Sequence, residues 1–526
     1  MRFISRPSIV RKGFCAIAPA MTEPTPNKTG TATGIDAASQ VGSSDDLSDQ
    51  VRRAVMWRTG TQIVSQAISW TATLMVIRIL NPADYGLFAM AQVMMTFLDF
   101  LNGYGFASAL IQSKHVSRQA IRQALGLAML LNAGIATLQF SLASTVAAYY
   151  GKPEVAELLH YLALIYLTTP FIIIPEVMLS RSLDFKRQAI VNLTAAMVGA
   201  TVSLSCALLG FGVWTLIYAP MALFLTRAIG LTIAARLFIL PSFNFRGAGA
   251  TLKFGLAMMG SHLFWVVQSQ SDIFIAGRRF DAHDVGLYAE ALFLTQLVMS
   301  KFVPPLNQVA FPAYARLQDD PVALRTNFLG SIRLIMLVTA PIFLGIVASA
   351  TPLVELLFGT KWLEMAPIMQ VLGLAMPVMT LQILFAPVNN ALGRPDVTMR
   401  ASMVGALCFA SAFIVGSSYG IAGLALAWLL ASPVLLIATI LLSSRLTGIG
   451  VEAVVGAAMP AIISAATMAA MVWLADHMLA PHMAPLPHVL LLVGLGGISY
   501  IALAWSFQRA TVTRLYSLVR SRQPSA

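Results

Sequence analysis

Long apolar segments follow one another along most of the chain, from about residue 58 to residue 508. Each is long enough to cross a hydrocarbon layer about 30 Å thick, which takes about 20 residues of helix. Backbone groups in lipid must find their hydrogen bonds inside the protein, so the pattern predicts membrane-spanning helices. We expect fourteen of them, over residues 60–80, 86–111, 123–148, 155–179, 189–209, 212–236, 254–276, 285–311, 328–350, 366–388, 401–416, 421–443, 453–475 and 488–508.

The first 50 residues differ from the rest, because they are rich in Thr, Ser, Gly, Asp and Pro. Such a segment has too few apolar residues to form a core, and we expect it to be disordered. The pattern therefore divides the chain into a cytoplasmic tail (1–50), a six-helix lobe (51–240), a second six-helix lobe (241–445), two additional helices (446–510) and a final tail (511–526).

The composition excludes a water-soluble globule. Hydrophobic residues make up 58% of the 526 residues and charged residues 11%, whereas soluble domains have about 45–50% and about 25%. With so few charges the chain has too little polar side-chain surface to face water. The sequence indicates an all-α, polytopic membrane protein.

Lys and Arg are distributed unevenly between alternate connections. If the N-terminus is cytoplasmic, 26 of the 34 lie on the cytoplasmic side, five on the opposite side and three within predicted helices. Because cytoplasmic loops carry an excess of these residues, we expect both termini in the cytoplasm. The net charge of +12 then reflects topology, and we expect no nucleic-acid partner.

A short pattern recurs 200 residues apart. Residues 78–89 read R-I-L-N-P-A-D-Y-G-L-F-A, and residues 278–289 read R-R-F-D-A-H-D-V-G-L-Y-A. A repeat of six helices returns the chain to the same side of the membrane, so the two lobes should be parallel and related by an axis along the membrane normal. The repeated Asp84, Gly86, Asp284 and Gly286 open predicted helices, where Asp is a common cap, and we expect structural roles for them.

Six motifs occur in order on or near the predicted connections, at Arg78–Phe88, Arg181–Phe185, Gly212–Trp214, Phe311–Leu317, Phe358–Trp362 and Leu392–Pro395. Together they resemble the motifs of Wzx-type polysaccharide flippases, in the multidrug/oligosaccharidyl-lipid/polysaccharide exporter superfamily. The resemblance runs from about residue 55 to residue 445, and the last two helices suit the fourteen-helix members of the family.

The resemblance implies an alternating-access flippase of the bacterial inner membrane. It would move a polyprenyl-diphosphate-linked oligosaccharide repeat unit from the cytoplasmic to the periplasmic leaflet, for exopolysaccharide, capsule or lipopolysaccharide assembly. The implied partners are this substrate, membrane lipid, and a polysaccharide polymerase with its export machinery. We expect a monomer without a cofactor, in which H⁺ or Na⁺ could serve as a coupling ion.

Polar residues inside membrane helices are costly and often functional, and two predicted helices carry them in stripes. On 254–276, Trp265, Gln268 and Asp272 follow a helical spacing, with His262 beside them. On 60–80, Gln62 and Gln66 follow the same spacing, with Arg58 at the cytoplasmic mouth. We expect the two stripes to line a shared cavity; the alternative is hydrogen bonding between packed helices.

Charged residues within predicted helices complete the candidate site. The cations Arg227, Lys301 and Arg333 are expected to contact the substrate, although Arg333 could instead extend to the cytoplasmic surface. The acids Asp99, Asp272 and Glu290, together with His262, are candidates for ion coupling or charge balance. Asp272 and Glu290 could alternatively pair with Arg278 or Arg279.

The chain has no G-x-x-x-x-G-K-[ST] motif that would bind ATP, and no loop presents the acidic or His cluster that a membrane polymerase would use. We therefore expect neither catalytic residues nor a metal site. Two alternatives stay open, namely a cation-coupled small-molecule exporter of the same superfamily and a membrane polysaccharide polymerase.

Overall fold

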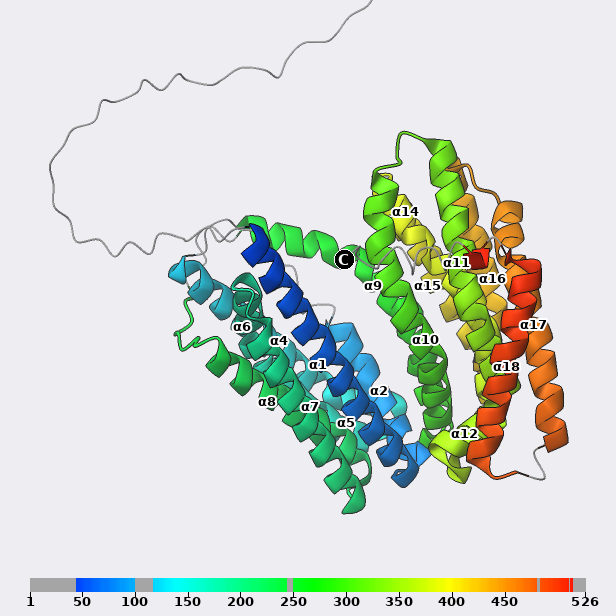
Figure 1. Ribbon diagram of the computed structural model, residues 1–526. Coiled ribbons are helices and arrows are strands. Elements are labelled where there is room, and N and C mark those ends of the chain that lie inside the picture. The colour runs from blue at the N-terminus through cyan, green and yellow to red at the C-terminus, as the bar shows by residue number, and fades with distance from the viewer. Residues whose placement is uncertain (1–43, 100–116, 244–248, 480–482, 510, 514–526) are drawn as a thin grey trace, which may run out of the picture. The chain divides into compact units, whose positions relative to one another are not determined.

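The computed structural model describes residues 44–99, 117–243, 249–479, 483–509 and 511–513. Residues 51–526 form one compact unit, and the description concerns that unit. Its described part consists of α-helices, short turns and three 3₁₀ helices (Figure 1). The first half contains α1 (Ser44–Ile79), α2 (Pro82–Asp99), α4 (Arg118–Tyr150), α5 (Glu154–Thr168), α6 (Pro170–Arg181), α7 (Phe185–Leu208), η1 (Gly212–Trp214) and α8 (Thr215–Ala234).

The second half repeats this order, with α12 and η2 inserted after its third helix and two further helices at its end. It contains α9 (Gly249–Arg279), α10 (Ala282–Ala315), α11 (Pro321–Ala348), α12 (Ala350–Phe358), η2 (Thr360–Met365), α13 (Ala366–Ile383), α14 (Phe385–Ala391), α15 (Pro395–Gly416), η3 (Ser417–Tyr419), α16 (Gly420–Thr447), α17 (Val451–Leu479) and α18 (Pro485–Phe507). The added pair packs against α11, with α18 also touching α12 (Figure 1).

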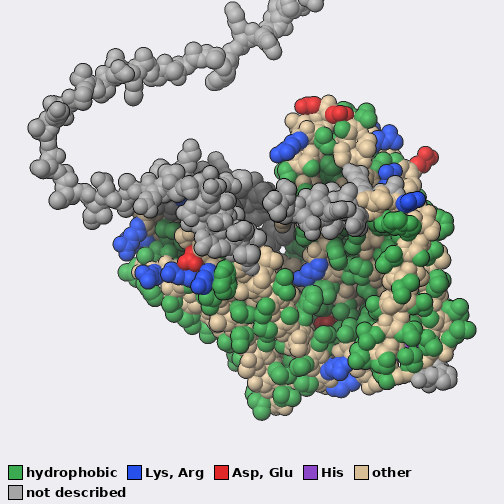
Figure 2. Space-filling model, viewed as in Figure 1, with side chains coloured by type: hydrophobic (Ala, Val, Ile, Leu, Met, Phe, Trp, Pro, Cys, Tyr) green, Lys and Arg blue, Asp and Glu red, His purple; other side chains and the backbone are tan. Residues whose placement is uncertain are grey.

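The predicted fold class, a polytopic all-α membrane protein, is confirmed. Nine helical segments of the described residues are long and apolar enough to cross a membrane, and one of them, residues 395–447, contains both α15 and α16. The count of fourteen stays a prediction. Figure 2 shows hydrophobic side chains over most of the described part of the face in view, with Lys and Arg mainly toward its upper and lower ends.

Two predicted spans are each broken into two helices. The span 155–179 is divided between α5 and α6, where Thr169 precedes Pro170, and the span 366–388 is divided between α13 and α14. Pro170 lacks the amide hydrogen that would continue the helix. Both breaks fall in the fourth predicted helix of a half, so the repeat extends beyond the short motif that revealed it.

The halves meet through a close backbone contact between α2 and α10. A Cβ atom on Gly86 would lie 1.8 Å from the carbonyl oxygen of Ala282, and one on Gly286 would lie 1.8 Å from that of Pro82. Only glycine permits this approach. The reciprocal pairing is what a pseudo-twofold axis between two parallel repeats produces.

The turns beside this contact are also joined across the halves. From α1, Arg78 Nε donates to the Leu357 carbonyl at 3.1 Å, and Trp362 Nε1 donates to the Ile77 carbonyl at 3.0 Å. From α9, Arg278 Nη1 donates to the Tyr149 carbonyl at 2.7 Å. The end of α1 thus binds α12 and η2, and the end of α9 binds the end of α4, each in the opposite half. We call this the outer end, because the sequence-based topology assigns it to the periplasmic side.

The repeated acidic residues help to build these turns. Asp84 Oδ2 accepts from the Asn81 amide at 3.0 Å, and the Asp281 side chain, as the cap of α10, accepts from the Asp284 amide at 2.9 Å. The predicted structural roles of Asp84 and Gly86 are therefore confirmed. In the second half Asp281, and not Asp284, is the capping residue.

We expect Gly86→Val to push α2 away from α10, because its Cβ would overlap the Ala282 carbonyl. Overpacking of this kind costs about 1–3 kcal/mol. Double electron–electron resonance between spin labels on the two outer turns should report a longer mean distance. Gly134→Ala, which meets nothing within 4 Å, is the matched control. An unchanged distance distribution in the Gly86→Val variant would show that the glycine contact does not hold the outer end together.

Candidate functional site

A polar pocket lies among α1, α7 and α8 in the first half. It is a cavity of about 340 Å³. Its walls carry amides, hydroxyls and one cation, with a few apolar side chains. The lining residues are Thr61, Gln62, Ser65, Gln66, Ser69, Phe185, Gln188, Ala189, Asn192, Ala195, Leu223 and Arg227. The structure thus brings together three residues that the sequence analysis selected: Gln62, Gln66 and Arg227.

Helical spacing explains how two of the walls form. Gln62, Gln66 and Ser69 are separated by four and three residues, so they share one face of α1. Gln188 and Asn192 share a face of α7 for the same reason. The α7 pair was missed in the sequence analysis, although its spacing was visible there.

A charged network closes the α8 side of the pocket. Arg227 Nη2 lies 3.4 Å from Glu176 Oε2, and Gln188 Nε2 donates to Glu176 Oε1 at 2.8 Å. Glu176 lies near the end of α6, where the sequence would suggest a side chain in solvent. In the structure its carboxylate binds Arg227 and Gln188. Its carboxylate therefore compensates the charge of Arg227 and holds one of the amides in place.

Three polar atoms at the pocket have no hydrogen-bond partner although they are buried: Ser65 Oγ, Asn192 Oδ1 and Arg227 Nε. Buried polar atoms are nearly always paired, since leaving one unpaired costs about 1–3 kcal/mol. Their residues line the pocket, so an unpaired donor and an unpaired acceptor lie beside it.

Lys301 on α10 is exposed, and its Nζ lies 5.7 Å from the ring centre of Trp70 on α1. This is a cation–π distance. Among the described residues, no carboxylate lies within ion-pair distance of Lys301. α10 runs through Pro304 and Pro305 as one helix, so the Lys is carried by continuous helical structure on both sides.

Arg333 lies in a different place from the other cations. It is exposed and lines a second cavity, of about 370 Å³, between α10 and α11. Most of that lining is apolar, and Tyr314 Oη donates to Ser331 Oγ at 3.0 Å within it. Arg333 is thus separate from the polar pocket of the first half.

Asp272 lies inside the second half, with no exposed surface, and does not face a cavity. Its Oδ2 accepts from Tyr288 Oη at 2.8 Å and from Trp428 Nε1 at 3.3 Å, while its Oδ1 accepts from the Ile273 amide at 2.7 Å. These donors come from three helices, α9, α10 and α16. The expectation that Asp272 faces the cavity is corrected: the carboxylate joins packed helices.

Gln268 is also buried, at 7% exposure, against α15. A Cβ on Gly405 would lie 2.2 Å from its Oε1, so α9 and α15 pack closely around the amide. This placement corrects the expectation that Gln268 lines a cavity. Trp265, one turn earlier, is 49% exposed, so the polar stripe of α9 is divided between a buried and an exposed part.

The remaining candidates have separate placements. Glu290 is half-buried on α10, and Asp99 is exposed at the end of the described part of α2. The arginines considered as alternative partners bind elsewhere: Arg278 at Tyr149, and Arg279 at Ser417 Oγ at 2.7 Å. The side chains of Arg58 and His262 lie outside the described residues.

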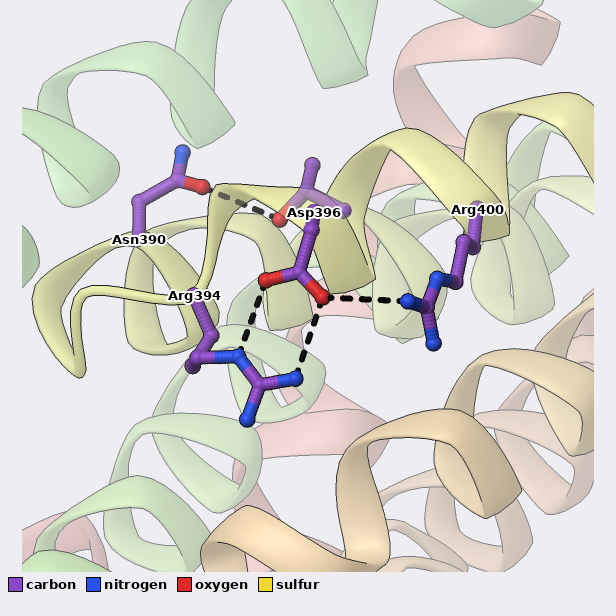
Figure 3. Close-up of polar contacts among 5 residues, drawn as sticks. Asn390, Arg394, Asp396 and Arg400 are labelled. Atoms are coloured by element: carbon purple, nitrogen blue, oxygen red, sulfur yellow. Dashed lines mark hydrogen bonds and ion pairs between the residues drawn. The ribbon is translucent and has the colours of Figure 1, made fainter.

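The turn between α14 and α15, which carries the motif Leu392–Pro395, is held by ion pairs (Figure 3). Arg394 binds the two carboxylate oxygens of Asp396 at 2.9 and 3.0 Å, and Arg400 lies 3.5 Å from the same carboxylate. Hydrogen bonding and charge from Asp396 raise the pKa of Arg394 above its ordinary value. Two hydrogen bonds from one guanidinium to one carboxylate fix the geometry of the turn. They give this motif a structural role.

The chain was compared with known proteins. The model of the family described as "Polysaccharide biosynthesis protein" matches residues 75–367, more than half of the chain. "Succinoglycan biosynthesis transport protein ExoT" of Rhizobium meliloti (strain 1021) is 24% identical over 90% of this chain and 97% of its own length. "Lipopolysaccharide biosynthesis protein WzxC" of Escherichia coli (strain K12) is 23% identical over 73% of this chain and 79% of its own.

Solved structures share the fold. "Lipid II flippase MurJ, inward closed conformation" aligns with a TM-score of 0.68 and 12% identity, over 86% of this chain and 99% of that one. An inward-facing multidrug resistance MATE family transporter aligns with a TM-score of 0.59 and 16% identity, over 73% of this chain and 95% of that one. Identity this low shows a common fold.

We expect Asp272→Leu to destabilise the protein by about 1–3 kcal/mol, because the Tyr288 hydroxyl would lose its acceptor in a buried site. Asp272→Asn should cost less, since the amide oxygen can still accept from Tyr288. Thermal unfolding of the purified protein in detergent measures both. If the Leu variant were as stable as the Asn variant, the network would not contribute to stability.

Proposed function

The chain belongs to the polysaccharide biosynthesis protein family, and we propose that it is a flippase for a lipid-linked oligosaccharide. The observation that carries this proposal is the match to a succinoglycan transport protein over 97% of that protein's length. The match covers 90% of this chain, so most of both halves lies within it. The chain itself is a multi-pass membrane protein.

We propose the bacterial inner membrane from the family to which the chain belongs, and both termini in the cytoplasm from the distribution of Lys and Arg. In that orientation the outer end, joined by Gly86 and Gly286, faces the periplasm. Contacts that join the halves at one end suit the inward-facing stage of an alternating-access cycle. A headgroup entering from the cytoplasmic leaflet would have to break the glycine contact before it could leave on the other side.

We propose that Lys301 contacts the diphosphate. It is exposed, it lies at cation–π distance from a Trp of the other half, and its charge is not compensated by a described carboxylate. An uncompensated cation in the membrane attracts an anionic group strongly, because the surroundings screen charge poorly. Arg58 and Trp265 are proposed as further contacts from the same first helices of the two halves.

Ion coupling, by H⁺ or Na⁺, is a second part of the proposal. Glu290 is the best-placed carboxylate for it, since it is half-buried on α10 and no described cation pairs with it. Asp99 and His262 remain candidates for charge balance. Asp272 is better suited to holding helices together, as its hydrogen bonds to Tyr288 and Trp428 suggest. Contacts with a polymerase and its export machinery are proposed from the biosynthetic role of the relatives.

We expect cells lacking this protein to accumulate the complete lipid-linked repeat unit on the cytoplasmic face of the inner membrane. Lipid extraction combined with a probe of sidedness measures this. Repeat units that accumulate unpolymerised on the outer face would instead indicate a polymerase. Unchanged glycolipids together with altered drug sensitivity would indicate a small-molecule exporter.

We expect Lys301→Ala to abolish polymer export while the protein stays in the membrane, and Lys301→Arg to retain a large part of export because the charge is kept. Export is measured as surface polysaccharide, with the protein level determined by immunoblot. Arg325→Ala, which removes an exposed cation near the start of α11, is the control. Normal export by the Lys301→Ala variant would remove this residue from the mechanism.

A further inference from the structure

We infer that the pocket among α1, α7 and α8 binds an uncharged sugar ring of the substrate and not its diphosphate. This inference rests on the proposed flippase function and names the part of the substrate that one site recognises. It also assigns different ligand groups to Arg227 and Lys301, two cations that the sequence alone places in one class.

The charge around the pocket is internally compensated. Arg227 is the one charged side chain among the described lining residues, and Glu176 lies 3.4 Å from it. A diphosphate bound there would approach the Glu176 carboxylate, and like charges repel strongly where screening is weak. An acidic sugar would meet the same repulsion. The pocket is therefore suited to a ligand without net charge.

The unpaired atoms include both a hydrogen-bond donor and an acceptor, and hydroxyl groups can pair with both. Arg227 Nε is a donor, Asn192 Oδ1 is an acceptor, and Ser65 Oγ can act as either. A sugar hydroxyl both donates and accepts, so neighbouring hydroxyls on one ring can pair with all three kinds of atom. An ionised phosphate oxygen only accepts and would leave Asn192 Oδ1 without a donor.

The apolar part of the lining and the size of the cavity agree with a single part of an oligosaccharide. Phe185, Leu223 and two alanines supply surface against which the C–H face of a sugar ring can pack. The volume of about 340 Å³ lies at the lower end of the range for ligand pockets, about 300–1,000 Å³. The site can enclose a portion of the headgroup while the rest stays outside.

The pocket lies close to the proposed diphosphate contact. Trp70, which Lys301 approaches, follows Ser69 of the pocket directly and lies one helical turn beyond Gln66. One turn of α1 is about 5.4 Å long. A substrate with its diphosphate at Lys301 can therefore place an adjoining sugar in the pocket.

The experiment measures binding of two probes to the full-length protein in lipid nanodiscs. One probe is undecaprenyl diphosphate, which carries no sugar, and the other is the lipid-linked oligosaccharide extracted from cells lacking this protein. Asn192→Leu should weaken binding of the oligosaccharide lipid at least tenfold and leave undecaprenyl diphosphate unchanged. Lys301→Gln should weaken both probes. Thr201→Val, on the same helix as Asn192 and exposed, is the control.

Gln66→Leu provides a second test from α1 if the Asn192 variant does not fold. Equal weakening of both probes by the pocket variants would overturn the inference, because the pocket would then bind the diphosphate. Unchanged binding of both probes would overturn it as well, because the pocket would not be a substrate site. A wild-type protein that binds neither probe would instead refute the proposed function.

Discussion

A polar group without a hydrogen bond costs several kcal/mol in hydrocarbon, and this constraint organises the whole molecule. It explains why the described chain is helical, and why the side chains of Asp272, Tyr288 and Trp428 are bonded to one another where they are buried. It also makes exceptions informative. Three of the unpaired buried atoms, in Ser65, Asn192 and Arg227, belong to residues that line one pocket.

The two halves are joined where side chains are smallest. At Gly86 and Gly286 the absence of a Cβ lets α2 and α10 approach until their backbones touch. Hydrogen bonds from Arg78 and Arg278 reach across on either side of this contact. A joint of this type combines close packing with a few directional bonds, and buried apolar residues of both halves pack beside it in one cluster.

Charge compensation distinguishes cations that look alike in sequence. Arg227 lies beside Glu176, Arg394 is held by Asp396, and Lys301 has no described carboxylate near it. The first cation shapes a neutral polar pocket, the second stabilises a turn, and the third is available to an anionic group. The same residue class is thus found in three different charge environments, according to its neighbours.

The sequence by itself determined the fold class, the repeat and the approximate helix positions, because hydropathy and helical spacing are local properties of the chain. It also selected Gln62, Gln66 and Arg227, since polar residues in apolar helices are rare. Only the tertiary structure showed that Gln268 and Asp272 are buried between helices and that Glu176 pairs with a residue 51 positions away. Spacing shows which residues share a helix face, but the rotation of each helix against its neighbours, set by packing, decides what that face meets.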